Sequence, residues 1–256
     1  MQSSCLYLIS IGISDEKDMS IKALEIAKSC DLLYAEFYTT KLNTTKENLE
    51  RLIGKPVKVL SREDVEDRYQ EIILNEAKMK KVGLLVGGDV FVATTHNALR
   101  LEAIKNKIPT KVIHGSSIIS ALGETGLHLQ KFGPFVTIPF PEKTKGKLPQ
   151  SVYDIIRANL ERNLHTLCLL DVISEEKRYL NVNEALSVLL KLEEENGKDV
   201  ITKDSKVVVF SAGKASKIFS GAVKKVLKKA FELPSVIIIP AKLHFTEKEY
   251  LELYEV

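Results

Sequence analysis

Short apolar runs alternate along the chain with segments whose apolar residues recur every three or four positions. An apolar run without polar alternation is typical of a strand covered on both faces, and the recurring spacing is typical of an amphipathic helix. The predicted strands are Leu6–Ile13, Leu32–Phe37, Val82–Val86, Lys111–Ile113, Thr166–Val172, Val207–Phe210 and Val236–Ile239. This alternation predicts an α/β protein with parallel or mixed sheets.

Helical spacing follows most of the predicted strands, and several helix ends have recognisable signals. Ser61-Arg62-Glu63-Asp64 resembles a capping box, which predicts that a helix starts there. Gly197 is a plausible cap at the end of a helix through Ala185 and Leu192. A further helix is expected from Val223 to Ala230.

The stretch Phe132–Leu148 is rich in glycine, proline, threonine and lysine, and it predicts a long irregular loop. We place a boundary between two lobes before this loop, near residue 114. The expected organisation is an N-terminal α/β lobe at residues 1–113 and a C-terminal α/β lobe at residues 114–256.

The composition narrows the class of protein. The formal net charge of +3 over 256 residues does not by itself indicate a nucleic-acid binder. Three cysteines without a CxxC pair, and five histidines without metal-ligand spacing, predict neither a zinc site nor disulfides. Cys30 and Cys168 are expected to be small buried hydrophobic residues. With no signal-peptide pattern and no apolar run of membrane-span length, the expected location is the cytoplasm, without membrane contact.

Candidate chemistry lies at the ends of the predicted strands, because ligands of open α/β sheets bind beyond the carboxyl ends of strands. Gly87-Gly88-Asp89 follows an apolar strand and offers free backbone donors beside a carboxylate. Asp89 could bind a ligand's ammonium or ribose hydroxyl groups, and it could equally cap the turn. The segment lacks the lysine and spacing of a P-loop.

Three other strand ends are candidates. Ser10–Asp15 contains one glycine, and a simple turn is the favoured interpretation. His114-Gly115-Ser116-Ser117 meets a predicted helix start, where free N–H groups suit anionic groups or serve ordinary capping. His244 follows the last predicted strand, although a lone histidine is more often structural. These patterns predict a cleft-binding enzyme without metal or P-loop, and they do not predict its reaction.

Ten short segments, in order along essentially the whole chain, match one known family. They are Leu24–Lys28, Ala35–Thr39, Leu60–Glu66, Val92–His96, Val112–His114, Thr125–His128, Lys131–Gly133, Ile138–Glu142, Leu164–Leu167 and Lys242–His244. In these segments the sequence resembles the diphthine synthases, which are methyltransferases of diphthamide biosynthesis within the tetrapyrrole-methylase-like class.

The resemblance implies two α/β lobes that bind S-adenosylmethionine in the cleft between them, and a homodimer. It implies methyl transfer to the amino group of a 3-amino-3-carboxypropyl-histidine on translation elongation factor 2, with S-adenosylhomocysteine as the by-product. No metal or nucleic acid is required, and no catalytic base is assigned. The implied cofactor contacts are Ile13, Asp89, Val92, Ser117, Ile118, Leu170, Ala212 and His244.

Two residues depart from the family pattern, and one segment is shorter than usual. Ser10 replaces the first glycine of a Gly-x-Gly turn, and Val90 replaces the proline of Gly-Asp-Pro. Phe210–Gly213 is one residue shorter, which makes Ala212 the least secure contact. The amine must be neutral to attack a methyl group, and a nearby carboxylate would favour its ammonium form. We therefore expect no obligatory protein acid in contact with the amine.

Three alternatives remain open from the sequence. The chain could be a methylase of the same fold that acts on a tetrapyrrole or on ribosomal RNA. It could be a non-catalytic, cofactor-binding regulatory protein. It could also be an RNA-binding module that uses the basic face of Lys224, Lys225, Lys228 and Lys229, although such faces are usually only solvated.

Overall fold

The computed structural model of the chain describes residues 4–174, 176–213 and 215–256. The chain forms two compact units, Met1–Ala121 and Leu122–Val256, each with its own five-stranded sheet. The lobe boundary expected from the sequence lay near residue 114. The first three residues, which belong to the segment inspected for a signal peptide, lie outside the described part of the chain.

The first unit contains a fully parallel sheet with the strand order β3-β2-β4-β1-β5. Its strands are β1 (Cys5–Gly12), β2 (Leu32–Glu36), β3 (Lys58–Leu60), β4 (Lys81–Gly87) and β5 (Thr110–Ile113). Its helices are α1 (Ile21–Ser29), α2 (Lys46–Ile53), α3 (Arg62–Glu66), a π-helical turn (Gln70–Leu74), α4 (Asn75–Ala77), α5 (His96–Lys105) and α6 (Ile118–Ala121), with a short 3-10 helix at Glu16–Asp18.

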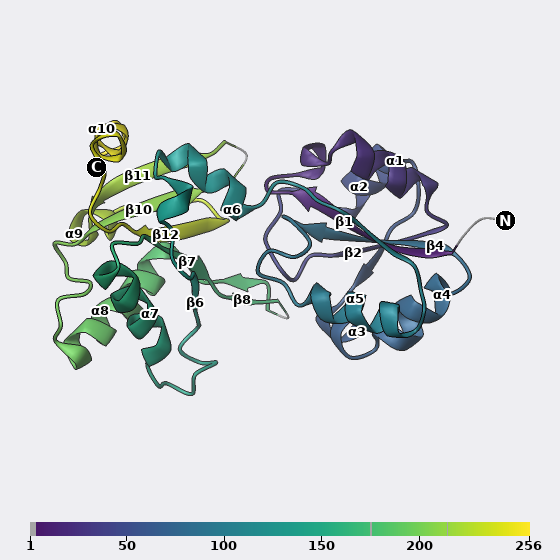
Figure 1. Cartoon of the computed structure of the whole chain (residues 1–256), viewed down its shortest axis with the longest axis horizontal. Helices are drawn as coiled ribbons and strands as arrows, with labels where there is room; N and C mark the ends of the chain where they lie inside the picture. Colours follow the sequence, from purple (N-terminus) through teal and green to yellow (C-terminus); the bar gives the residue numbers. More distant parts are fainter. Residues whose placement is uncertain (1–3, 175, 214) are drawn as a thin grey trace. The chain divides into compact units, whose positions relative to one another are not determined.

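Helices cover both faces of the first sheet, which explains why its strands are apolar throughout. Successive residues of a strand point to opposite faces, so Leu6 and Leu8 pack on one side and Tyr7 and Ile9 on the other. Figure 1 shows α1 and α2 on one side of this sheet and α3, α4 and α5 on the other. The capping box predicted at Ser61 is confirmed, with the Asp64 N–H donating to the Ser61 Oγ.

The second unit contains a mixed sheet with the strand order β11-β10-β12-β7-β6. Its strands are β6 (Val136–Ile138), β7 (Thr166–Leu170), β10 (Lys206–Ser211), β11 (Lys217–Ala222) and β12 (Ser235–Ile239), and a separate hairpin joins β8 (Val172–Ile173) and β9 (Arg178–Tyr179). Its helices are α7 (Gln150–Glu161), α8 (Val182–Asn196), α9 (Val223–Val226) and α10 (Phe245–Glu252), with 3-10 helices at Leu122–Thr125 and Leu129–Lys131.

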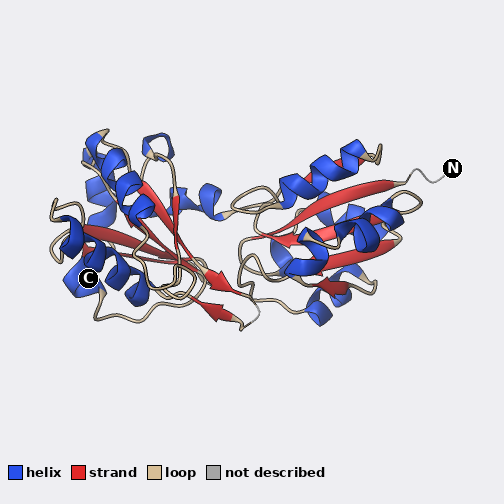
Figure 2. Cartoon of the chain, turned by 90° about the horizontal axis from the view of Figure 1, so that it is seen from below, coloured by secondary structure: helices blue, strands red, loops and turns tan. Residues whose placement is uncertain are grey.

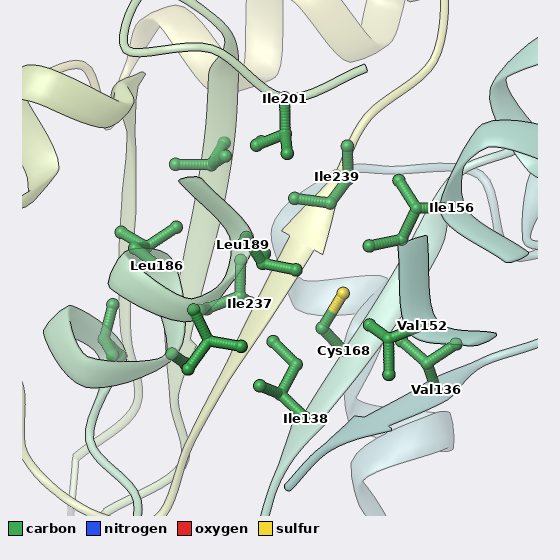
Figure 3. Close-up of a cluster of buried hydrophobic side chains, with 14 of the residues drawn as sticks. Val136, Ile138, Val152, Ile156, Cys168, Leu186, Leu189, Ile201, Ile237 and Ile239 are labelled. Atoms are coloured by element: carbon green, nitrogen blue, oxygen red, sulfur yellow. The ribbon is translucent and has the colours of Figure 1, made fainter. Parts of the chain in front are cut away.

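The core of the second unit lies between its sheet and the helices α7 and α8. Ile138, Cys168 and Ile237 of the sheet pack against Ile156 of α7 and Leu189 of α8 (Figure 3). Secondary-structure colouring shows the same arrangement of helices flanking strands in each unit (Figure 2). The helix α8 ends at Gly197 in the left-handed conformation, as the sequence predicted. Cys5, Cys30 and Cys168 are free and buried.

The structure corrects three predictions in the second half of the chain. The stretch predicted as the irregular loop Phe132–Leu148 contains β6, whose three residues are too short to give a clear pattern. The predicted strand Thr166–Val172 ends at Leu170, and Val172 belongs to the hairpin. The helix expected from Val223 to Ala230 ends at Val226. Within the described residues, no helix has the length and apolar character needed to cross a membrane.

Candidate functional site

The ends of β1 and β4 meet at two glycines. The Gly12 N–H donates to the Gly88 carbonyl at 3.2 Å, and the Gly88 N–H donates to the Gly12 carbonyl at 2.7 Å. Both residues have positive φ, +108° and +70°. A Cβ at Gly12 would lie 2.3 Å from the Asp18 Cβ, whereas a Cβ at Gly88 would meet no atom within 4 Å. Gly12 therefore permits a close approach, while the backbone at Gly88 faces open space.

Ser10 and Val90, the two residues that depart from the family pattern, contact each other. The Val90 N–H donates a 3.0 Å hydrogen bond to the Ser10 Oγ, and both residues are buried. A proline at position 90 would have no N–H to donate, and a glycine at position 10 would have no hydroxyl to accept. Ser10 and Val90 thus form a matched pair that holds the end of β1 against the loop after β4.

Asp89 lies at the centre of this edge of the sheet, and both of its carboxylate oxygens have partners. Oδ1 accepts from the Phe91 N–H at 3.0 Å, which is the turn-capping contact considered from the sequence. Oδ2 lies 2.8 Å from the His114 Nδ1 and accepts from the Gly115 N–H at 3.2 Å. Burial raises the pKa of this carboxyl, but these hydrogen bonds outweigh burial and the pKa is lowered.

The other four predicted contacts of the first unit come from the same edge. Ile13 follows β1, Val92 lies in the loop after Asp89, and Ser117 and Ile118 follow β5. Since β4, β1 and β5 are parallel neighbours, their carboxyl ends lie side by side. Ser117 is buried, and its N–H donates to the Ser120 Oγ at 2.9 Å in the first turn of α6. The structure therefore brings together all five predicted residues of this unit at one sheet edge.

In the second unit, strand direction separates the predicted residues. β10 and β7 both run antiparallel to β12, so their ends at Ala212 and Leu170 share one edge. His244 follows the carboxyl end of β12, where Ile239 pairs with Thr166 at the start of β7. His244 therefore lies at the opposite edge of the sheet from Leu170 and Ala212. The residue of β12 on their edge is Ser235, whose Oγ lies 2.7 Å from the Ser211 Oγ.

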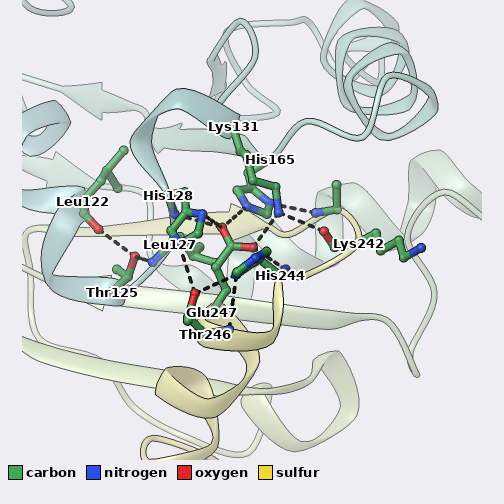
Figure 4. A network of polar contacts seen from close by, with 11 residues as sticks. Leu122, Thr125, Leu127, His128, Lys131, His165, Lys242, His244, Thr246 and Glu247 are labelled. Atoms are coloured by element: carbon green, nitrogen blue, oxygen red, sulfur yellow. Dashed lines mark hydrogen bonds and ion pairs between the residues drawn. The ribbon is translucent and has the colours of Figure 1, made fainter.

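His244 belongs to a polar network that fixes α10 (Figure 4). Its Nδ1 lies 2.8 Å from the Thr246 Oγ1 at the helix start. The fully buried carboxylate of Glu247 accepts hydrogen bonds from the His244 N–H at 2.7 Å and the Lys131 Nζ at 2.5 Å. It also accepts from the His128 N–H at 2.9 Å and lies 3.0 Å from the His165 Nε2.

This network gives Glu247 an unusually stable negative charge. Burial raises its pKa, but the hydrogen bonds from Lys131, His128, His244 and His165 lower it to about 2. The His165 Nδ1 accepts from the Ala241 N–H at 2.9 Å, so the Nε2 carries the proton that faces Glu247. No local pattern in the sequence indicated this group, because its partners lie up to 119 positions away along the chain.

Other candidate features lie apart from these edges. Among the described residues, no three histidine, cysteine, aspartate or glutamate side chains form a group that could hold a metal. Lys224 of the basic face pairs with Asp204 at 2.5 Å. A hollow of about 470 Å³ in the second unit is lined by residues that include Phe219, Tyr250 and Tyr254, and by none of the predicted contacts.

Comparison with known proteins defines the class. The family model of the tetrapyrrole (corrin/porphyrin) methylases matches residues 5–213. The chain belongs to this family, and it is therefore a methyltransferase that uses S-adenosylmethionine.

Its relatives within the family are diphthine synthases. The diphthine synthase of Methanocaldococcus jannaschii is 46% identical over 253 residues, covering 96% of this chain and 97% of the relative. The diphthine synthase of Methanococcus maripaludis strain S2 is 42% identical over 251 residues, covering 96% of this chain and 97% of the relative. A crystal structure of diphthine synthase superposes with a TM-score of 0.88 at 33% identity and covers 98% of this chain and 96% of that one. The chain groups with the diphthine synthases, which confirms the resemblance and the two-sheet α/β fold expected from it.

Proposed function

We propose that the chain methylates the amino group of the 3-amino-3-carboxypropyl-histidine on translation elongation factor 2, giving diphthine. The observation that carries this proposal is the 46% identity to a diphthine synthase along nearly the whole of both chains. Bound S-adenosylmethionine would supply an activated methyl group on its positive sulfur. The protein's task is then to align the amine with that methyl group and to exclude water.

The carboxyl edge of the first sheet suits the cofactor. A Cβ at Gly88 would meet no atom within 4 Å, which leaves room for a ligand beside this loop, and the carboxylate of Asp89 can accept hydrogen bonds from ribose hydroxyls. Its partner His114 has a side chain that is 68% exposed, so a ligand can displace that ring at low cost. We propose that Ile13, Asp89, Val92, Ser117 and Ile118 contact the cofactor.

In the second unit we propose Leu170 and Ala212 as further cofactor contacts. The direction of β12 favours Ser235 over His244 for the contact expected after the last strand, because Ser235 shares an edge with Leu170 and Ala212. Comparison of Ser235→Ala with His244→Ala by calorimetric titration of S-adenosylmethionine tests this choice. Weaker binding only in His244→Ala would contradict it.

The central experiment uses elongation factor 2 that carries the unmethylated intermediate. The protein and S-adenosylmethionine are added, and the mass of the modified peptide is measured by mass spectrometry. Increments of one methyl mass are expected, and their number shows whether three or four methyl groups are transferred. If the mass of the peptide does not increase, the proposal is wrong. Tetrapyrrole methylation would appear instead as an absorbance change on titration, and RNA binding as a steep dependence on salt.

Asp89→Ala tests the cofactor edge. Removing the carboxylate should raise the Kd for S-adenosylmethionine by about tenfold or more, since hydrogen bonds to charged groups contribute about 1.5–3 kcal/mol. Asp67→Ala, which changes an exposed aspartate at the end of α3, is the matched control and should leave the Kd unchanged. An unaltered Kd in Asp89→Ala would remove this residue from the site.

We also propose a homodimer in the cytoplasm, as the resemblance implies. Sedimentation equilibrium of the purified chain should give a mass of twice 28.7 kDa. A monomer at micromolar concentration would contradict the dimer.

A further inference from the structure

Buried polar atoms without a hydrogen-bond partner gather at one edge of the first sheet. Within the described residues, nine buried side-chain nitrogen or oxygen atoms lack a partner, and six of them follow strands β1, β2 or β4. These six belong to Glu16, Glu36, Tyr38, Asn43 and His96. Native proteins leave few such atoms unpaired, so this concentration indicates that a polar group is missing.

Three of these residues form one cluster, which we call the Glu36 cluster: Glu36, Tyr38 and His96. The Glu36 Oε2 accepts from the Tyr38 N–H and the Thr39 N–H, each at 3.0 Å, while its Oε1 has no partner. The rings of Tyr38 and His96 are stacked with centroids 6.4 Å apart. The Tyr38 hydroxyl and both ring nitrogens of His96 are also unpaired. All three side chains are less than a tenth exposed.

The Glu36 cluster lies beside the proposed cofactor edge. Glu36 ends β2, one residue beyond the pair of Ala35 with Leu85 of β4, and β4 leads directly into Gly87-Gly88-Asp89. The segment after β2 folds over this point, because a Cβ at Gly87 would lie 2.6 Å from the Thr40 side chain. The proposed cofactor contacts include none of the three cluster residues.

The unpaired atoms are suited to a group that donates N–H bonds. Burial lowers the pKa of His96 to about 4, so its ring is neutral and keeps one lone pair as an acceptor. The Tyr38 oxygen is a further acceptor, and so is the Glu36 Oε1 when Glu36 is ionised. A neutral primary amine offers N–H groups to two of these acceptors and keeps its lone pair free to attack the methyl group, and it is the reacting group of the methyl acceptor.

Near neutral pH Glu36 is only partly ionised, so it favours the ammonium form of a bound amine less than a fully ionised carboxylate would. Burial raises the pKa of Glu36 to about 7, although hydrogen bonds from Thr39 and Tyr38 and the charge of Arg62 oppose the rise. Arg62 lies over the Tyr38 ring at 5.0 Å, and Glu66 is the other charged group that acts on Tyr38. The sequence led us to expect no obligatory protein acid in contact with the amine, because a carboxylate would favour the ammonium form. The Glu36 cluster departs from that expectation, since burial keeps Glu36 partly protonated.

We propose that the Glu36 cluster binds the amino group of the methyl acceptor. This inference rests on the proposed function and adds the acceptor subsite to it. Because the side chains are buried, the segment from Tyr38 to Leu42 must move aside when the acceptor enters. The Asn43 N–H, which donates to the Ser14 carbonyl at 2.8 Å, marks the far end of that segment.

Tyr38→Phe is the sharpest test, because it removes one unpaired hydroxyl and keeps the ring beside Arg62 and His96. Removing a buried unsatisfied group should raise the Tm by about 2–4 °C. The same change should raise the KM for the modified elongation factor roughly tenfold. The Kd for S-adenosylmethionine should stay unchanged. A protein that is more stable and binds its acceptor more weakly is the expected signature of a binding site.

Ser220→Ala is the matched control. Ser220 of β11 is fully buried, and its Oγ is likewise unpaired. Its removal should raise the Tm without changing the KM. His96→Leu provides a second, independent variant and should also raise the KM while leaving the cofactor Kd unchanged.

The outcomes are distinguishable. If the unaltered protein methylates elongation factor 2 but Tyr38→Phe and His96→Leu keep its KM, the acceptor subsite is wrong and the proposed function stands. If the unaltered protein transfers no methyl group, the proposed function is wrong, and the acceptor subsite, which rests on it, is wrong as well. A KM that rises equally in Ser220→Ala would show a general effect of buried hydroxyls and overturn the subsite.

Discussion

Glu36 in the first unit and Glu247 in the second are both buried carboxyl groups, with side chains at most 1% exposed, yet their surroundings differ in every other respect. Glu247 receives four hydrogen bonds shared between both oxygens. Glu36 receives backbone hydrogen bonds on one oxygen only, and the other has no partner. The pKa of Glu247 falls to about 2, and that of Glu36 rises to about 7.

The difference separates a structural group from a candidate functional one. Glu247 joins α10 to the start of β7 and to the segment from His128 to Lys131, so its charge contributes to holding three segments together. Glu36 contributes little of this kind, and its unpaired oxygen costs free energy in the ligand-free chain. A group that destabilises the fold in isolation is expected where a ligand completes it.

Removal of the Glu247 side chain should have the largest effect on stability. Glu247→Ala leaves Lys131, whose side chain is only 20% exposed, without its charged partner and leaves three further donors without their acceptor. Breaking a buried ion pair costs about 3–5 kcal/mol, which should appear as a lower free energy of unfolding in urea. Glu249→Ala, an exposed change on the same helix, should stay within about 0.5 kcal/mol. If Glu247→Ala lowers the free energy of unfolding by less than about 1 kcal/mol, Glu247 is not the stabilising group that distinguishes it from Glu36.

Glu36 and Glu247 should change the stability of the fold in opposite directions as the pH rises, because folding raises the pKa of Glu36 and lowers that of Glu247. The pKa of Glu36 rises from 4.5 to about 7 on folding, so between these values the unfolded chain has already lost the proton that the folded chain keeps. Stability therefore falls as the pH rises from 4.5 to 7, by up to about 3 kcal/mol at 1.36 kcal/mol per unit.

Glu36→Gln, which cannot ionise, should remove this decline. Urea titrations of both proteins from pH 4.5 to 8 measure the difference. Curves that stay parallel over this range would show that Glu36 is ionised throughout, as Glu247 is.

Much of the fold could be predicted from the sequence, because buried strands of an α/β protein leave uninterrupted apolar runs. β4 and β10 lie within two residues of the predicted runs Val82–Val86 and Val207–Phe210. β11 was missed, since four of its six residues are partly or fully exposed and its pattern is mixed. β6 was missed because three residues between prolines resemble a loop.

The site was less predictable, for physical reasons. Gly87-Gly88-Asp89 could be found because glycines and an acid after an apolar run form a local pattern. Strand direction has no local pattern, so the sequence could not show that β12 is antiparallel and that Ser235, which pairs with Ser211, lies at the opposite edge from His244. Glu36 and Glu247 could not be found, because burial and pairing depend on residues far away in the sequence.

The smallest expected effect on stability concerns the hydrogen bond between Val90 and Ser10. These two buried polar groups satisfy each other, whereas the Glu36 Oε1 has no partner. Ser10→Gly leaves the buried Val90 N–H unpaired, and Val90→Pro leaves the Ser10 hydroxyl unpaired. The double change removes donor and acceptor together, so its cost should be about 1 kcal/mol smaller than the sum of the single costs.

A control cycle combines Val90→Pro with Ser61→Ala, which removes the cap of α3 at a residue bonded to Asp64 and not to Val90. This cycle should be additive within about 0.5 kcal/mol. Additivity in the Ser10 cycle as well would mean that the hydrogen bond contributes nothing. Satisfied and unsatisfied polar groups at this edge would then be energetically alike, and the argument that assigns a ligand to Glu36 would lose its basis.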